Sequence, residues 1–209
     1  MLFTKSDKKK SLSNNSFEYC IKEGDIFSAG GWKVIPFNEF FDTTVDDVII
    51  AKSSLNGIFI ERYAEMIKLT QTIKNAQLIE TNLKPKMVDN RLQYPLGRII
   101  VYEDYMLLAL THFNKKNEAE LKERIFKQCI KNMIHEFSRT YADKPIFLPL
   151  LGSGITRFRD VTKRNCDLLN WMIYVFETCG ININKPITIV LTKEVIENDE
   201  IKRIIHSIK

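Results

Sequence analysis

The sequence contains no run of 18 consecutive apolar residues, and its opening Met1, Leu2 and Phe3 are followed at once by polar and charged residues. A membrane-spanning helix needs about 20 apolar residues, and a secretory signal needs a longer apolar stretch than three residues. We therefore expect neither feature within these 209 residues. The expected location of the domain is cytoplasmic.

Cysteine and histidine are few and scattered. The four cysteines form no C-x-x-C pair, and the three histidines lie far apart in the sequence. Zinc sites need ligands at short, regular spacings, so we expect no metal site, and the thiols should be reduced and mostly buried. The histidines are expected to be structural or surface residues. The residues concerned are Cys20, Cys129, Cys166, Cys179, His112, His135 and His206.

Two catalytic motifs are also missing. No G-x-x-x-x-G-K-[ST] pattern occurs, which argues against a Walker-type nucleotide hydrolase. Ser153 lies in G-S-G rather than in G-x-S-x-G, which argues against the nucleophile elbow of an α/β-hydrolase. We expect no catalytic residue and no cofactor.

The net charge of +5 is concentrated at the start of the chain. Residues 1–10 hold four lysines against one aspartate, a net +3, so the remaining residues carry only about +2. That balance gives little support to nucleic-acid binding, which the sequence therefore does not predict. Residues 1–16 are polar and basic, and they are interpreted as a flexible leader or as a linker that could lie beside a membrane. Residues 17–209 are expected to form one domain, because 44% hydrophobic content suffices for a core and no second composition regime appears.

Strand-like and helical patterns alternate along the chain. The helical segments show apolar residues at three- and four-residue steps, and the strands are short apolar or alternating runs between turn signals. This order predicts an α/β sandwich with helices on both faces of the sheet. The expected strands are 16–21, 32–37, 98–102, 105–112, 144–148 and 186–191. The expected helices are 58–79, 117–141 (capped by Asn117 with Glu120), 159–178 (ended by Gly180) and one starting near 192. Segment 45–53 stays ambiguous, and 82–95 is expected to be a polar loop.

The stretch from Pro149 to Phe158 follows one of these strands and precedes a helix. Two glycines beside a serine allow a tight turn whose backbone N–H groups surround an anion, and the next helix adds the positive end of its dipole. A plain strand-to-helix turn is the alternative interpretation. Sheets of this class bind ligands beyond the carboxyl ends of their strands, where three loops are expected: after Gly24, over residues 38–57, and at Gly152.

These loops resemble those of the macro domain family. The resemblance rests on Gly24-Asp25-Ile26 at a strand end, on Val34 to Asn38, on Leu55-Asn56-Gly57-Ile58 before a helix, and on the glycine loop; it covers roughly residues 17–208. It implies a three-layer α/β sandwich with a mixed central sheet. It also implies that the ligand is a nucleotide derived from ADP-ribose.

The stretches 54–59 and 149–158 more narrowly resemble the macro-type sensing domain of Thoeris antiphage effectors. This resemblance implies a receptor for an ADP-ribose-based signal, such as an amino-acid conjugate, made by a partner TIR-domain protein. Sensors of that group can be joined to transmembrane helices. A membrane segment preceding residue 1, tethering to the inner membrane and ligand-driven homo-oligomerisation are therefore further expectations.

The same resemblance implies roles for individual residues. Asp25, helped by Ile26, would accept from the adenine amine, and Asn38 would face the distal ribose or the group attached to it. The diphosphate would lie between a helix start and the glycine loop, with Phe158 against the adenosine end. The full set of expected ligand-binding residues is Asp25, Ile26, Asn38, Leu55, Asn56, Gly57, Gly152, Ser153, Gly154, Ile155, Thr156, Arg157 and Phe158.

The sequence departs from the pattern of macro domains that remove ADP-ribose. Those domains usually keep an Asn-Ala-Ala-Asn-like run and a triple glycine, where this chain has Pro36-Phe37-Asn38 and Asn56-Gly57, separated by an extra stretch, 43–53. The departures favour a sensor that reads the ligand. An ADP-ribosyl hydrolase is the alternative function.

Overall fold

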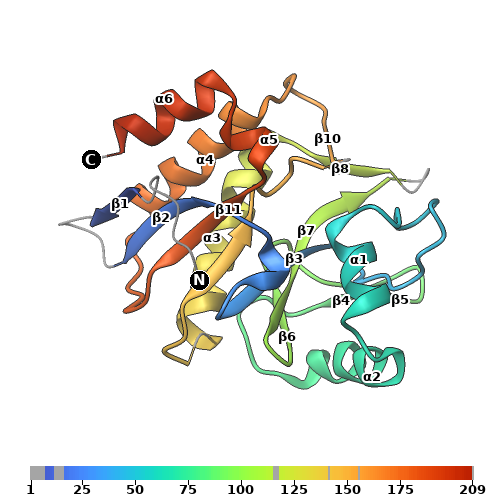
Figure 1. The fold of residues 1–209 in the computed structure, drawn as a ribbon. Coiled ribbons are helices and arrows are strands. Elements are labelled where there is room, and N and C mark those ends of the chain that lie inside the picture. The colour runs from blue at the N-terminus through green and yellow to red at the C-terminus, as the bar shows by residue number, and fades with distance from the viewer. Residues whose placement is uncertain (1–7, 12–16, 115–117, 141, 155, 209) are drawn as a thin grey trace.

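The structure is a computed structural model that describes residues 8–11, 17–114, 118–140, 142–154 and 156–208. Within these residues, nine strands form one sheet in the order β1-β2-β11-β9-β3-β7-β8-β10, and β6 also pairs with β7. Helices cover both faces of this sheet (Figure 1). The expected α/β sandwich with a mixed central sheet is thereby confirmed.

The centre of the sheet is parallel. Each neighbouring pair in the series β2, β11, β9, β3 and β7 runs in the same direction, so their carboxyl ends lie at one edge. Most of their side chains are buried, as expected for strands covered by helices on both faces. These strands are Glu18–Glu23 (β2), Ile187–Leu191 (β11), Ile146–Pro149 (β9), Trp32–Asn38 (β3) and Tyr105–Phe113 (β7).

The margins of the sheet are shorter strands. On one side β1 pairs antiparallel with β2, and on the other β7 pairs antiparallel with β6 along its first half and with β8 at its end. Strand β10 adds in parallel to β8, and β4 and β5 form a separate hairpin. The bounds are Lys8–Ser11 (β1), Ile99–Tyr102 (β6), Ala119–Leu121 (β8), Arg157–Phe158 (β10), Lys86–Val88 (β4) and Arg91–Gln93 (β5).

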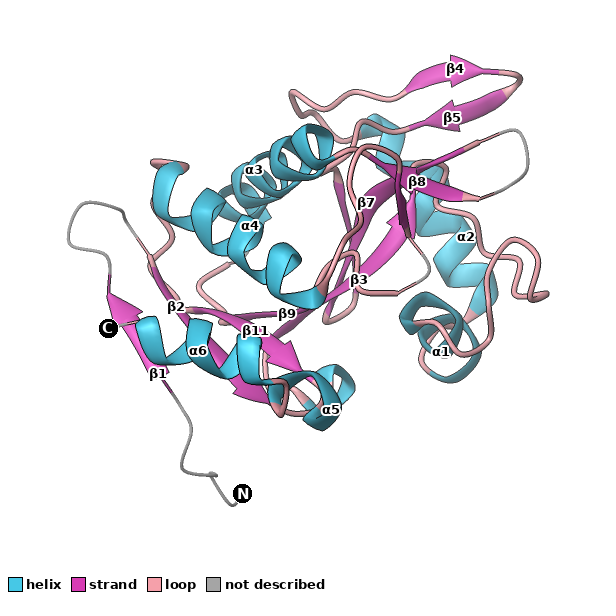
Figure 2. Cartoon of the chain, turned by 90° about the horizontal axis from the view of Figure 1, so that it is seen from above, coloured by secondary structure: helices cyan, strands magenta, loops and turns pink. Residues whose placement is uncertain are grey.

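The helices form the outer layers. Helices α3, α4 and α6 pack one against the next, whereas α1 packs on β3 and α2 on β6. Figure 2 shows α3 and α4 on one side of β9, β3 and β7, with α1 and α2 on the other. The helices are Leu55–Arg62 (α1), Met66–Asn75 (α2), Glu123–Thr140 (α3), Asn165–Thr178 (α4), Lys193–Ile196 (α5) and Asp199–Ser207 (α6), with short 3-10 turns at Ile26–Ser28 (η1) and Ala76–Leu78 (η2).

The single helix expected over 58–79 is wrong, because the chain forms two helices, α1 and α2. Between them the backbone N–H of Glu65 donates to the hydroxyl of Tyr102 at 2.9 Å, which replaces a helical bond with a bond to β6. The predicted apolar stripe is broken as well, since Phe59 is buried but Ile67 is 81% exposed. The tertiary contact overrides the local pattern here.

The helix expected from Asn117 begins six residues later, at Glu123. Asn117 lies outside the described residues, and Glu120 is in β8, where its carboxylate pairs with Arg159 instead of closing a capping box. The carboxylate of Asp160 accepts from the Glu123 amide at 3.1 and 3.2 Å. A residue distant in sequence therefore provides the N-terminal bond of α3.

Three further expectations need correction. The helix expected over 159–178 begins at Asn165, because Arg157–Phe158 forms β10. The last helix is divided at Asn198, whose side chain accepts from the Glu200 and Ile201 amides in the first turn of α6. The polar loop 82–95 contains the β4-β5 hairpin.

Within the segment expected to be a flexible leader, residues 8–11 form edge strand β1, and residues 1–7 and 12–16 lie outside the described residues. The division at residue 16 stays a prediction. Among the described residues, none of the helices combines the length and the apolarity that crossing a bilayer requires.

Candidate functional site

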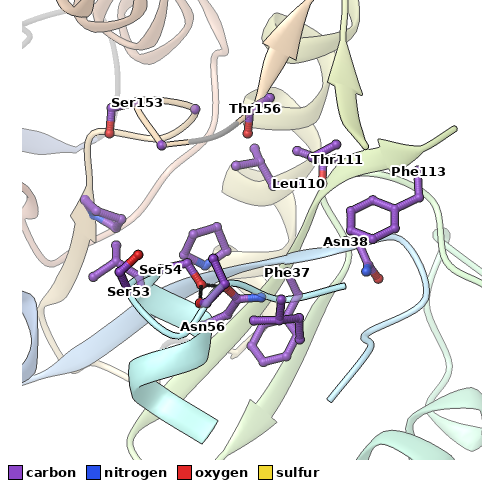
Figure 3. A pocket seen from close by; sticks show the side chains of 18 of the residues that line it. Phe37, Asn38, Ser53, Ser54, Asn56, Leu110, Thr111, Phe113, Ser153 and Thr156 are labelled. Atoms are coloured by element: carbon purple, nitrogen blue, oxygen red, sulfur yellow. Dashed lines mark hydrogen bonds between the residues drawn. The ribbon is translucent and has the colours of Figure 1, made fainter. Parts of the chain in front are cut away.

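A cavity of about 240 Å³ opens at the carboxyl ends of β3, β7 and β9. Four segments line it: the end of β3, residues 49–51 with 53–56, the end of β7 with Ala119, and residues 149–150 with 152–154 and 156. Ile155 lies outside the described residues. Figure 3 shows Ser53, Ser54 and Asn56 on one side of this space and Ser153 and Thr156 on the other. The cavity thus lies where parallel sheets present ligand sites.

The first wall is the start of α1, here called the helix corner (residues 54–57). Ser54 is the N-cap, with extended backbone angles, and its hydroxyl oxygen accepts from the Gly57 amide at 3.2 Å. Leu55 and Asn56 are the first two helical residues, and both line the cavity. Amides at the first helical positions have no partner within the helix, so they can donate to an anion.

Gly57 is required by packing. A Cβ at this position would lie 2.3 Å from the Ala51 carbonyl oxygen and 3.1 Å from that of Lys52. The preceding loop can therefore fold tightly against the start of α1 only if residue 57 has no side chain. Gly57 itself does not line the cavity, and its amide is used by Ser54, so its part in the site is to allow this close approach.

The opposite wall is the glycine loop (residues 152–154). It begins as a turn in which the Ser153 amide donates to the Leu150 carbonyl at 3.3 Å, and the Ser153 hydroxyl donates to the same oxygen at 2.7 Å. Gly152 has φ +79°, a conformation that favours glycine. A Cβ on Gly154 would meet nothing within 4 Å, so this residue faces open space.

The described lining contains no Asp, Glu, Lys or Arg side chain. The polar groups are hydroxyls, amides and backbone, and the only cation that contacts the glycine loop among the described residues is Lys163. Its Nζ donates to the Gly152 carbonyl and, at 2.9 Å, to the Gly154 carbonyl. Burial lowers the pKa of Lys163 to about 8.

Asn38 lies at the far end of the cavity, near Phe113 (Figure 3). It is 4% exposed, and its side chain is held by three hydrogen bonds. The Oδ1 atom accepts from the amides of Phe40 at 2.9 Å and Asp42 at 3.3 Å, and Nδ2 donates to the Asp42 carboxylate at 2.9 Å. Since one Nδ2 hydrogen is left, Asn38 can offer a ligand a single donor.

The extra stretch 43–53 forms one rim of the cavity. Its only bridge joins Val45 to Ile50, so within the described residues it is a structured loop and not a strand of the sheet. The amides of Ile49 and Val48 donate to the Asp46 carboxylate and lower its pKa. Ile49 and Ile50 contribute apolar surface to the cavity lining.

Seven of the thirteen sequence-predicted site residues line the cavity: Asn38, Leu55, Asn56, Gly152, Ser153, Gly154 and Thr156. Two of the three expected loops, those after β3 and β9, therefore meet around one space. Asp25, Ile26, Gly57, Arg157 and Phe158 are not part of the lining, and Ile155 lies outside the described residues.

The loop after β2 does not line the cavity. The exposed Asp25 caps η1, since its carboxylate accepts from the Phe27 amide at 3.0 Å and the Ser28 hydroxyl at 3.3 Å, while Ile26 is buried. Phe27 stacks on Tyr63 at the end of α1, with 4.6 Å between ring centroids. A contact between Asp25 and an adenine therefore stays a prediction.

Arg157 and Phe158 have protein partners in β10. Arg157 pairs with Glu118. The Phe158 ring packs against Phe126 and Trp171, with centroids 5.7 and 5.6 Å apart. Both side chains therefore have structural partners within the protein. Their expected contacts with a ligand stay predictions.

Sequence reasoning missed much of the cavity wall. The end of β7 supplies Leu110, Thr111 and Phe113, which no motif marked, although 105–112 was expected to be a strand and strand ends are where ligands bind. Ser54 was also missed, and its position just before a helical run is a capping signal that could have identified it. Within the described residues, no group of His, Cys, Asp or Glu could hold a metal ion.

Comparison with solved structures supports the fold. A variant macrodomain of Oceanobacillus iheyensis, solved with ADPR, matches 96% of this chain and 99% of its own length with a TM-score of 0.59 and 12% sequence identity. At this identity the likeness concerns the fold alone. The macro-domain-like architecture expected from the sequence is confirmed.

Sequence comparison is more specific. The chain is 38% identical over 192 residues to the Thoeris protein ThsA of Bacillus amyloliquefaciens (strain Y2), covering 87% of this chain. It spans only 65% of the length of that relative. The model of the family described as Thoeris protein ThsA, Macro domain, matches residues 20–192. The chain therefore belongs to the Thoeris ThsA macro domain family.

Proposed function

We propose that this domain is the sensor of an antiphage defence effector and binds a nucleotide signal derived from ADP-ribose. The observation that carries the proposal is the pair of donor-bearing corners, the helix corner and the glycine loop, facing each other across one uncharged cavity. A diphosphate is the ligand group that suits such a site, because backbone amides at a helix start and in a glycine turn bind phosphate without a charged side chain.

In the proposed complex the diphosphate lies between the amides of Leu55 and Asn56 on one side and that of Gly154 on the other. The group attached to the distal ribose reaches towards Asn38 and Phe113. The rim stretch 43–53 at this end of the cavity allows attached groups of different kinds. The apolar surface of Ile49 and Phe113 and the single donor of Asn38 suit an attached group with both apolar and polar parts, such as an amino acid.

Reading the ligand is favoured over hydrolysing it. Asn38 spends three of its four hydrogen-bonding positions on residues 40 and 42, which limits its use in orienting a water or a ribose hydroxyl. The Pro36-Phe37-Asn38 segment also has one asparagine where the run found in hydrolytic macro domains has two. Both features support a binding role.

The wider proposal concerns the whole protein. A TIR-domain partner makes the signal in the cytoplasm, and ligand binding switches the effector on, through a ligand-driven homo-oligomer or through a segment tethered to the inner membrane. Membership of the ThsA macro domain family supports the link to a TIR-derived signal.

The test is a thermal-shift panel of ADP-ribose, NAD, cyclic ADP-ribose and amino-acid conjugates of ADP-ribose, with AMP as the control that lacks the diphosphate. A ligand at 100 times its Kd adds about 2.7 kcal/mol, which corresponds to about 5–10 °C for a domain of this size. We expect the largest shift from a conjugate. Absence of any shift with the diphosphate compounds, confirmed by calorimetry, contradicts the proposal.

Hydrolysis is tested separately with O-acetyl-ADP-ribose and ADP-ribosylated protein. We expect less than one turnover when substrate is in large excess. Rapid turnover at catalytic enzyme concentrations would establish the alternative, an ADP-ribosyl hydrolase.

A further inference from the structure

Lys163 contacts the glycine loop from outside the cavity. Its Nζ donates to the carbonyls of Gly152 and Gly154, and these two residues line the cavity while Lys163 does not. The ammonium group therefore reaches the loop from a residue that is not part of the cavity wall. A loop with these two carbonyls fixed on one side has less freedom to turn a carbonyl towards a bound anion.

Besides these two carbonyls, the Lys163 ammonium group faces the Phe158 ring, whose centroid lies 5.8 Å from Nζ. It forms no ion pair with any carboxylate that the structure describes. The acidic groups closest in sequence are engaged elsewhere: Asp160 accepts from the Glu123 amide, and Asp167 pairs with Arg164. The arginines of β10 and its continuation pair with Glu118 and Glu120.

Burying this ammonium group has an electrostatic cost. Burial lowers the pKa of its ammonium group to about 8, because no carboxylate offsets the loss of water. A half-buried cation without an acidic partner is unusual, and an anion in the adjacent cavity would supply the missing negative charge.

We propose that Lys163 is the positioning residue of the glycine loop: it holds the Gly152 and Gly154 carbonyls away from the cavity and places beside an incoming diphosphate the positive charge that the lining lacks. The inference rests on the proposed function and extends it with a residue that acts through the loop. Lys163 itself does not touch the ligand.

One consequence distinguishes this role from a purely structural one. A diphosphate close to Lys163 raises the pKa of its ammonium group above the free value of about 8, so binding is accompanied by proton uptake. If the rise is about one unit, uptake near pH 8.5 is about half a proton per ligand. Affinity is then full below pH 8 and falls by up to about tenfold as the pH rises through the bound pKa.

The experiment measures ADP-ribose binding by calorimetry from pH 7 to pH 9.5, in pairs of buffers with different ionisation enthalpies, which count the protons taken up. The wild-type chain is compared with Lys163→Met, Lys163→Arg and Lys131→Met. Lys131 is exposed on α3, so its substitution is the matched control for the loss of one positive charge. Urea unfolding shows that each variant is folded.

We expect Lys163→Met to bind ADP-ribose about tenfold more weakly than wild type at pH 7, without proton uptake, because two charge-assisted bonds to the loop are lost. Lys163→Arg should retain affinity to within about threefold and lose the dependence on pH, because guanidinium does not titrate in this range. Lys131→Met should match wild type in affinity and proton uptake.

The outcomes separate the two proposals. If wild type does not bind ADP-ribose or its conjugates, the proposed function fails, and this inference fails with it. If wild type binds and folded Lys163→Met binds equally well, or takes up the same number of protons, the proposed function stands and the role of Lys163 is refuted.

Discussion

The two corners that face each other across the cavity are built in different ways. The helix corner is fixed by its own neighbours: Ser54 caps the Gly57 amide, and Gly57 packs against the Ala51 carbonyl. The glycine loop is held from outside by Lys163, eleven residues after Gly152 in the chain, and Gly154 has no neighbour within 4 Å of an added Cβ.

This difference suggests that the two corners behave differently when a diphosphate binds. A corner closed by local packing offers its amides in one geometry, so it can serve as the fixed reference for a diphosphate. The glycine loop is held by the Ser153 turn and by Lys163, and only Gly154 has open space beside it, so any adjustment to an anion should be confined to the Gly154 end of the loop. Substitutions at the helix corner should therefore lower both stability and binding, whereas substitutions in the glycine loop should lower binding alone.

The largest effect is expected at Gly57. A Cβ there would overlap the Ala51 carbonyl at 2.3 Å, so Gly57→Ala should displace the start of α1. Overpacking of this kind costs about 1–3 kcal/mol of unfolding free energy, measurable by urea unfolding, and ADP-ribose binding should fall below detection. Unchanged stability together with unchanged binding would show that the helix corner is not fixed in the way described.

Gly154→Val should separate binding from folding. Its side chain enters open space at the cavity wall, so the melting temperature should stay close to that of wild type while affinity for ADP-ribose falls about tenfold to a hundredfold. Gly30→Val is the matched control, since a Cβ at Gly30 also meets nothing within 4 Å and this residue lies outside the cavity lining. Equal loss of affinity in both variants would show that the glycine loop is not part of the ligand site.

The smallest effect tests whether the site extends beyond the two corners to Asp25. Asp25→Asn keeps a side-chain oxygen that can cap η1 but removes the charge. If Asp25 accepts from an adenine amine, Asp25→Asn should weaken binding by about 1.5 kcal/mol, roughly tenfold, and Asp25→Ala should weaken it further. Calorimetry that finds wild-type affinity in Asp25→Asn and a loss only in Asp25→Ala would assign Asp25 to capping alone.

The sequence predicted the central strands well because buried strands have a simple local signature. Ile187–Leu191 and the hairpin of β6 and β7 lie where apolar runs between turn signals indicated them. Helix boundaries were predicted less well. The amide of Glu65 bonds to Tyr102, and the Glu123 amide bonds to Asp160, so each boundary depends on a residue 37 positions away.

The glycine loop and the helix corner were recognisable in the sequence because each is a local backbone arrangement that depends on glycine. Thr111 and Phe113 were not recognisable, because their place in the wall follows from β7 lying parallel to β3. Arg157 and Phe158 looked like part of the loop, but pairing of β10 with β8 places them against Glu118 and Trp171.

The sequence by itself therefore determined the class of fold and the positions of the two corners, since turns, caps and apolar periodicity are set by residues close together in the chain. Only the tertiary structure decided which strand ends enclose the cavity and that Lys163 lies behind the glycine loop. These features depend on the order of strands in the sheet, which contacts between distant residues fix and local sequence does not encode.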